Sequence, residues 1–191
     1  MTERFNSEPR ASRSTVLTQN GMVCSASPLA ATVGIQVLSQ GGNAFDAFVS
    51  VSSALVLVDP LFSVLGGCGF FLLHRASDGL DVLIDAREVA PAAASEGMYL
   101  DASGEPIPGA SRNGPLAAGI PGLPAALVHL AENYGRLPLS ESLQPAIRLA
   151  EQGFPAYDWH LTRLDRRAEN MNDAALAVFL PAGAPPAQGS P

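Results

Sequence analysis

The chain has 191 residues, of which 47% are hydrophobic and 15% are charged, and its formal net charge is −7. The apolar fraction is sufficient for the core of one ordinary globular domain and excludes an intrinsically disordered chain. Lysine and arginine are few and scattered, so the sequence lacks the basic patch that nucleic-acid binding requires.

The N-terminal segment, residues 1–20, is polar and is expected to be a flexible lead-in. It has no apolar region of the kind found in secretory signal peptides, so the sequence as given indicates a cytoplasmic chain or one whose targeting segment is absent. Residues 22–26 (MVCSA) are predicted as a short strand.

Cys24 and Cys68 have neither CxxC nor metal-ligand spacing. We expect two buried free thiols, with a disulfide as the alternative, and no metal or cofactor.

Two consecutive helices are predicted next. Pro28 suits the first turn of a helix, and the glycine pair at 41–42 ends it. Asn43 suits the N-cap of the second helix, with Asp46 near the capping-box position, and this helix is expected to run to about Val58. Its apolar stretch is shorter than the ~20 residues of a membrane span. It is therefore predicted to be a buried helix, and no membrane partner is expected.

A β-hairpin is predicted after these helices. Apolar runs at 70–74 and 82–85 flank the polar sequence RASDG, which contains Asp78-Gly79. The glycine-rich sequence LGGCGF before the first run satisfies no phosphate-binding pattern, so it is expected to pack closely against neighbouring backbone.

The rest of the chain is predicted to be mostly helical. Amphipathic patterns indicate helices at about 121–134, 139–152 and 157–170. The tail at 181–191 is rich in proline, alanine and glycine and is predicted to be a loop. Two helices, a hairpin and then further helices predict an α+β fold in which helices sandwich antiparallel strands.

Arg87, at the end of the second predicted strand, is the candidate binding residue. A guanidinium group matches a carboxylate with two parallel hydrogen bonds and stays charged at any working pH, and a strand end is a rigid mount for it. Asp85 and Glu88 flank it in sequence. The residues therefore allow two interpretations: a structural ion pair of Arg87 with Asp85 or Glu88, or a clamp for a substrate carboxylate.

No residue stands in a pattern typical of a catalytic nucleophile. The motifs GxSxG and HExxH are absent. The histidines are isolated and are expected to be surface or helix-face residues; they are His74, His129 and His160. No catalytic residue is therefore expected in this chain.

Several blocks of the sequence together resemble the N-terminal part of the γ-glutamyltransferase (γ-glutamyltranspeptidase) family. They include GGNAFDA, LGGCGF and DAREVAP, and they follow the family's order over about residues 21–189. The resemblance implies a four-layer αββα sandwich of the N-terminal-nucleophile hydrolase type, incomplete in this chain, with a partial large-subunit domain at 21–180. It also implies that Arg87 binds the α-carboxylate of the γ-glutamyl group, supported by Asp85 and Glu88.

The resemblance further implies a reaction and a partner. Family precursors cleave themselves, and the new N-terminal threonine of the small subunit attacks a γ-glutamyl amide, typically that of glutathione. The acyl group then passes to water, an amino acid or a peptide, without a cofactor. No threonine here has the family's Thr-Thr-His setting; they are Thr2, Thr15, Thr18, Thr32 and Thr162.

We therefore expect a fragment that ends inside a family element and is inactive alone, with the small-subunit segment of the same precursor as its partner. A related acylase for glutaryl side chains of β-lactam precursors and a non-catalytic remnant are the alternatives. Many family members are periplasmic or secreted, so the resemblance leaves the location open. Cys68 takes a position that is usually glycine in the family, and it would be strained if that position required a positive φ.

Overall fold

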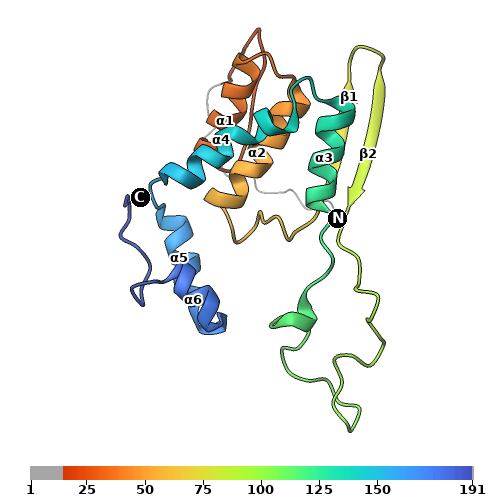
Figure 1. The fold of residues 1–191 in the computed structure, drawn as a ribbon, viewed down its shortest axis with the longest axis vertical. Coiled ribbons are helices and arrows are strands. Elements are labelled where there is room, and N and C mark those ends of the chain that lie inside the picture. Colours follow the sequence, from red (N-terminus) through yellow and green to blue (C-terminus); the bar gives the residue numbers. More distant parts are fainter. Residues whose placement is uncertain (1–14, 191) are drawn as a thin grey trace, which may run out of the picture.

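The computed structural model of the chain describes residues 15–190. Figure 1 shows a cluster of helices with a hairpin at its edge and a long excursion between the hairpin and the third helix. In chain order the elements are α1 (Pro28–Ser39), α2 (Ala44–Val58), β1 (Gly69–Arg75), β2 (Leu80–Ala86), η1 (Pro115–Ala117), α3 (Leu123–Tyr134), α4 (Leu139–Gln152), α5 (Asp158–Arg167), η2 (Ala168–Asn170) and α6 (Asp173–Phe179).

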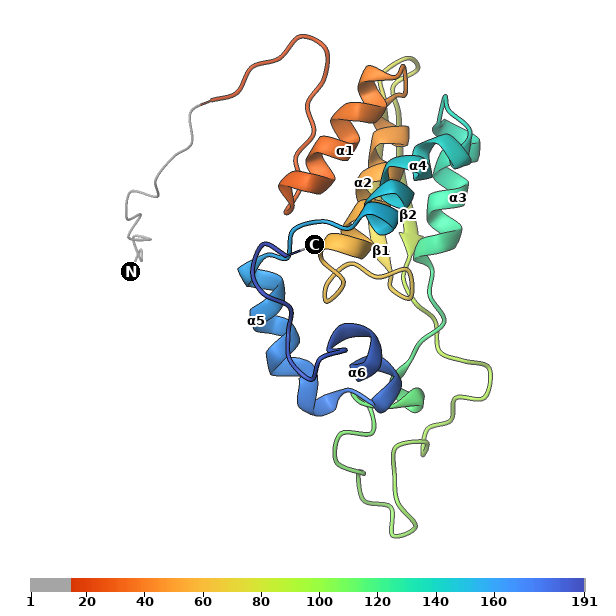
Figure 2. The same cartoon turned by 60° about the vertical axis from the view of Figure 1, so that its left-hand side comes forward.

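Helix α2 is the centre of the structure and contacts α1, α3 and α4. Figures 1 and 2 both show it among these helices. Its apolar residues belong to two core clusters. Val49 packs with the hairpin and α3, whereas Ala54 and Val58 pack with α1 and α4. A helix that is apolar on most sides is expected to be covered on several sides, and the structure confirms this prediction.

The hairpin has one covered face and one open face. In the antiparallel register, Phe71 pairs with Ile84, and this face packs in the core with α3. On the opposite face Phe70, Leu72 and Leu83 are 62%, 82% and 64% exposed. Helices therefore cover only one face of the hairpin. The prediction that helices sandwich the strands is wrong for the open face. This open apolar face is the one that a second sheet covers in an αββα sandwich, so the fold is an incomplete α+β sandwich.

Most elements lie where the sequence predicts them, with three exceptions. Residues 22–26 form no strand, because a strand needs a hydrogen-bonding neighbour and, over residues 15–190, the sheet contains only β1 and β2. The short helices η1 and α6 were not predicted. Of the lead-in at 1–20, residues 1–14 lie outside the described residues. Over the part of the chain that is described, no helix has the length and apolarity needed to cross a membrane.

The predicted junction between α1 and α2 is confirmed and has a second role. Asn43 and Asp46 form the capping box of α2. The buried Asp46 carboxyl also accepts hydrogen bonds from the backbone N–H groups of Arg136, at 3.0 Å, and Leu137, at 3.3 Å. The Asn43 amide donates to the Tyr134 carbonyl at 2.7 Å. The sequence GGNAFD therefore joins the start of α2 to the turn between α3 and α4.

Candidate functional site

Arg87 is the first residue after β2 and lies beside the open face of the hairpin. Its guanidinium carbon is 5.9 Å from the centre of the Phe70 ring, which is on that face. Its side chain is 50% exposed. The end of an antiparallel strand fixes the backbone, so only the side chain remains free to adapt. Arg87 is thus a cation on a rigid mount beside the uncovered face of the sheet.

The structure brings together all three sequence-predicted site residues, but it gives the two acids different partners. Glu88 accepts a hydrogen bond from Nη2 of Arg87 at 3.0 Å. Asp85 instead accepts from the backbone N–H of Arg87 at 2.9 Å, so it secures the strand end and not the guanidinium. Over residues 15–190, the guanidinium has no other hydrogen bond. An ion pair through one nitrogen is therefore present, and it leaves donors for a second carboxylate.

The surroundings of Glu88 favour the ionised form of its carboxyl group. A hydrogen bond from Cys68, together with a backbone hydrogen bond and the charge of Arg87, holds the pKa of the Glu88 carboxyl below its usual value. Lowering the pKa keeps this carboxyl ionised, and able to pair with Arg87, to a lower pH than in an unfolded chain. The pairing is lost only as the pH falls through the lowered value.

Cys68 fits its position without backbone strain. No residue other than glycine has a positive φ between residues 15 and 190, so the strain considered for this glycine position is absent. Both thiols are free, but only Cys68 is partly buried; Cys24 is exposed. The expectation of two buried thiols is therefore wrong for Cys24, because the segment that carries it joins no sheet.

A segment distant in sequence supports the strand end. Val89 and Ile120 form an antiparallel bridge with N–H···O distances of 3.2 and 2.9 Å. Gly122 lies directly against the carbonyl of Ala86, and a Cβ on Gly119 would be 3.0 Å from Cγ of Glu88. Sequence reasoning missed these contacts. The signal available was the repeated glycine in GIPG, which allows the close approach of two backbones.

We expect Gly122→Ala to displace the backbone that carries Arg87. The added methyl would overlap the carbonyl of Ala86 and approach that of Arg87, and backbone atoms cannot rotate away as a side chain can. Overpacking of this kind costs about 1–3 kcal/mol. Thermal unfolding should show this loss of stability as a lower melting temperature of the variant. Gly97→Ala is the matched control, because nothing lies within 4 Å of its Cβ position, and an unchanged melting temperature for both variants would contradict the packing argument.

Among the described residues, none of the three histidines has a hydrogen bond with Arg87, Asp85 or Glu88. His74 pairs with Asp81 across the hairpin at 2.8 Å. His129 interacts with Asn133 on α3. Burial lowers the pKa of His160, and the charge of Asp59 opposes this shift. Over residues 15–190, no group of three or more histidine, cysteine, aspartate or glutamate side chains could hold a metal ion.

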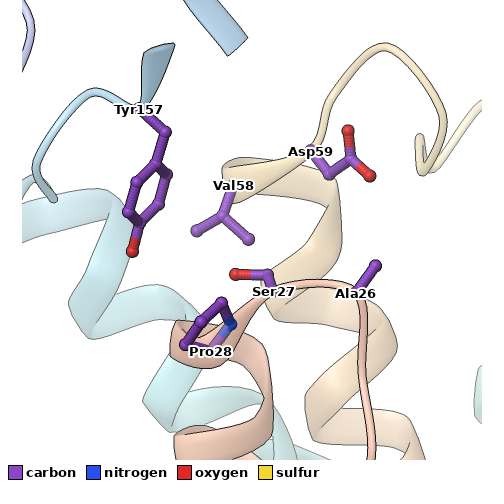
Figure 3. Close-up of a pocket in the computed structure, with 6 residues that line it drawn as sticks. All are labelled: Ala26, Ser27, Pro28, Val58, Asp59 and Tyr157. Carbon is purple, nitrogen blue, oxygen red and sulfur yellow. The ribbon is translucent and has the colours of Figure 1, made fainter. Parts of the chain in front are cut away.

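A separate cavity of 340 Å³ lies where the start of α1 meets the end of α2. Figure 3 shows the Ser27 hydroxyl pointing into it, with Tyr157 on the opposite side. This hydroxyl is buried and has no hydrogen-bond partner among the described residues. None of the residues that line the cavity belongs to the hairpin or to residues 85–91, so it is distinct from the Arg87 region.

Comparison with known proteins gives the family. The family model described as gamma-glutamyltranspeptidase matches residues 30–191. A glutathione hydrolase proenzyme of Pseudomonas sp. (strain A14) is 44% identical over 144 residues, which are 75% of this chain and 25% of that protein. The solved gamma-glutamyltranspeptidase of Helicobacter pylori is 35% identical, with a TM-score of 0.88 over 92% of this chain and 51% of that one.

A solved cephalosporin acylase of Bacillus halodurans is also similar. It is 30% identical, with a TM-score of 0.80 over 100% of this chain and 36% of that one. The chain thus spans about a quarter of the length of the Pseudomonas relative and about half of the Helicobacter pylori chain. The family model covers most of the sequence, and the motifs around Asn43, Cys68 and Arg87 lie within the matched range. The chain belongs to the gamma-glutamyltranspeptidase family.

Proposed function

We propose that this chain supplies the carboxylate-binding arginine of an enzyme that transfers or hydrolyses γ-glutamyl groups. The observation that carries the proposal is the state of Arg87: one guanidinium nitrogen is anchored by Glu88, and the side chain is half exposed beside the open face of the hairpin. Two parallel charge-assisted hydrogen bonds from the remaining donors suit the α-carboxylate of a γ-glutamyl donor such as glutathione.

In this proposal the rest of the enzyme provides the nucleophile. The hydroxyl of an N-terminal threonine attacks the γ-carbonyl carbon, the amine of the donor leaves, and the acyl group passes to water, an amino acid or a peptide. Two observations support this division of roles between the present chain and the rest of the enzyme. Matched relatives are described as glutathione hydrolase proenzymes and are longer than this chain. The uncovered face of the hairpin, which carries Phe70 beside Arg87, offers the small-subunit segment a place to pack.

The test is turnover of γ-glutamyl-p-nitroanilide by the whole enzyme, with and without an amino-acid acceptor. Release of nitroaniline that the acceptor accelerates is the expected result. Residues 1–191 expressed alone should give no turnover, because an arginine that binds the donor cannot cleave it. Turnover by this segment alone would contradict the proposed division of roles.

A second candidate function is the acylase activity named for the Bacillus halodurans structure, which matches the full length of this chain. A glutaryl group differs from a γ-glutamyl group only by lacking the α-amino group, so Arg87 could bind either one. The matched pair γ-glutamyl- and glutaryl-p-nitroanilide separates the two functions. A higher kcat/KM for the γ-glutamyl compound supports the proposal, the reverse order supports the acylase, and turnover of neither supports a non-catalytic remnant.

A further inference from the structure

The ends of three helices meet at the cavity of 340 Å³ that Ser27 lines. Ser27 is the N-cap of α1 and Tyr157 is the N-cap of α5, and they lie on opposite sides of the cavity (Figure 3). Val58, the last residue of α2, and Asp59, the C-cap of α2, line it as well. A helix carries partial positive charge at its N-terminus and partial negative charge at its C-terminus. Two positive helix ends and one negative helix end therefore surround this cavity.

The Ser27 hydroxyl is available to a ligand in the cavity. Ser27 is only 8% exposed, and its hydroxyl has no hydrogen-bond partner among the described residues. A serine at an N-cap usually accepts a hydrogen bond from a backbone N–H group of its own helix. Here no such bond forms, and the hydroxyl points into the cavity instead (Figure 3). Because a buried polar group without a partner costs free energy, a ligand that hydrogen-bonds to Ser27 gains by doing so.

Backbone N–H groups at the start of α1 add to the positive side. Pro28 has no N–H group, and the N–H of Ala31 donates to the Ser27 carbonyl at 3.0 Å. Between them, the N–H groups of Leu29 and Ala30 have no hydrogen bond among the described residues. Free N–H groups in the first turn of a helix, together with the helix dipole, favour a negatively charged group. A carboxylate is therefore suited to the Ser27 side of the cavity.

The end of α2 favours the opposite charge. The carbonyl groups of Leu57 and Val58 accept no hydrogen bond over residues 15–190, and Asp59 adds a carboxylate. Figure 3 shows this carboxylate turned away from the Ser27 hydroxyl. A cation is stabilised at a helix C-terminus, whereas a second negative charge on the ligand would be repelled there. The cavity therefore suits a ligand with one negative and one positive group.

We propose that this cavity binds a free α-amino acid with an apolar side chain. The carboxylate of the ligand accepts from the Ser27 hydroxyl and the start of α1, and its ammonium group faces the end of α2. Its side chain packs against the apolar wall of Ala26, Pro28 and Val58. The volume is at the lower end of the about 300–1,000 Å³ of small-molecule sites, so a single amino acid fits better than a peptide. The site does not depend on the role proposed for Arg87.

The first test is the binding of leucine to the whole enzyme, measured by calorimetry without a γ-glutamyl donor. Saturable binding is expected in the Arg87→Gln variant, in which the proposed donor clamp is absent. Isocaproate is leucine without the ammonium group, and isoamylamine is leucine without the carboxylate. Each should bind about tenfold more weakly than leucine or worse, because each loses contacts of a charged group. Equal binding of either compound and leucine would show that the site does not recognise an amino acid.

A pair of Ser27 variants separates ligand binding from helix capping. Aspartate and asparagine cap a helix about as well as serine and have the same size as each other, so α1 should form in both variants. Ser27→Asp places a negative charge beside the ligand carboxylate and should weaken leucine binding by about 100-fold or more. Ser27→Asn keeps a neutral donor and should stay within about tenfold of the wild type. Equal leucine binding by the two variants would mean that Ser27 serves only as a cap.

Asp59→Asn tests the opposite end of the site. It should weaken leucine binding by about three- to tenfold and leave isocaproate binding unchanged, since isocaproate has no ammonium group. Asp165→Asn, on the exposed surface of α5, is the matched control and should bind leucine as the wild type does. Leucine binding that survives both Ser27→Asp and Asp59→Asn takes place elsewhere, such as at the site of an amino-acid acceptor, and overturns the proposal. Failure of the wild type to bind leucine also overturns it.

Discussion

Replacing Arg87 with glutamine is expected to raise the KM for γ-glutamyl-p-nitroanilide by about 30- to 1,000-fold. Truncating one partner of a charge pair in a binding site costs about 2–4 kcal/mol, and each 1.4 kcal/mol is a factor of ten. Arg87→Lys keeps the charge but loses the two-pronged geometry, so a smaller rise of about tenfold is expected. Because arginine does not titrate in the working pH range, the effect should persist throughout that range. Steady-state kinetics at several pH values measure both variants.

Arg75→Gln is the matched control for this prediction. Arg75 ends the other strand of the same hairpin and pairs with Asp78 at 2.7 Å. Exposed pairs of this kind contribute about 0–1 kcal/mol, so the variant should fold and bind its donor normally. If Arg87→Gln also leaves KM unchanged, then the contact with Glu88 is only a structural ion pair and the chain does not bind the donor through Arg87.

Asp46→Ala is expected to lower the free energy of unfolding by about 3–5 kcal/mol. The Asp46 side chain is fully buried and accepts hydrogen bonds from the N–H groups of Asn43, Arg136 and Leu137. Each buried donor left without a partner costs about 1–3 kcal/mol, and the capping box of α2 is lost as well. Urea unfolding of the whole enzyme, followed by far-UV circular dichroism, measures the change.

Two further variants test whether the loss of stability is specific to the Asp46 carboxyl group. Asp46→Asn retains one acceptor oxygen but turns an N–H₂ group toward backbone donors, so an intermediate loss of about 2–3 kcal/mol is expected. Asp165→Ala on the exposed surface of α5 should stay within about 0.5 kcal/mol of the wild type. Equal stability of Asp46→Ala and Asp165→Ala would show that the turn between α3 and α4 does not depend on Asp46.

The sequence by itself determined the elements whose signals are local. Pro28 starts α1, Asn43 caps α2, and the turn at Asp78-Gly79 closes the hairpin, because each depends on backbone groups within a few residues of the signal. The sequence also determined the family and singled out Arg87, since the relevant motifs are contiguous. Residues 22–26 show the limit of such signals, because an apolar run becomes a strand only beside a neighbouring strand.

The tertiary structure alone decided which groups meet across the chain. The apolar residues of β1 alternate between both faces, so the pattern could not tell that α3 covers Phe71 while Phe70 stays open beside Arg87. The approach of Gly122 to Ala86 and of Gly119 to Glu88 likewise depends on how the hairpin packs against residues far along the chain. Hydrogen-bond partners distant in sequence follow from packing, and packing is settled only when the helices and strands assemble.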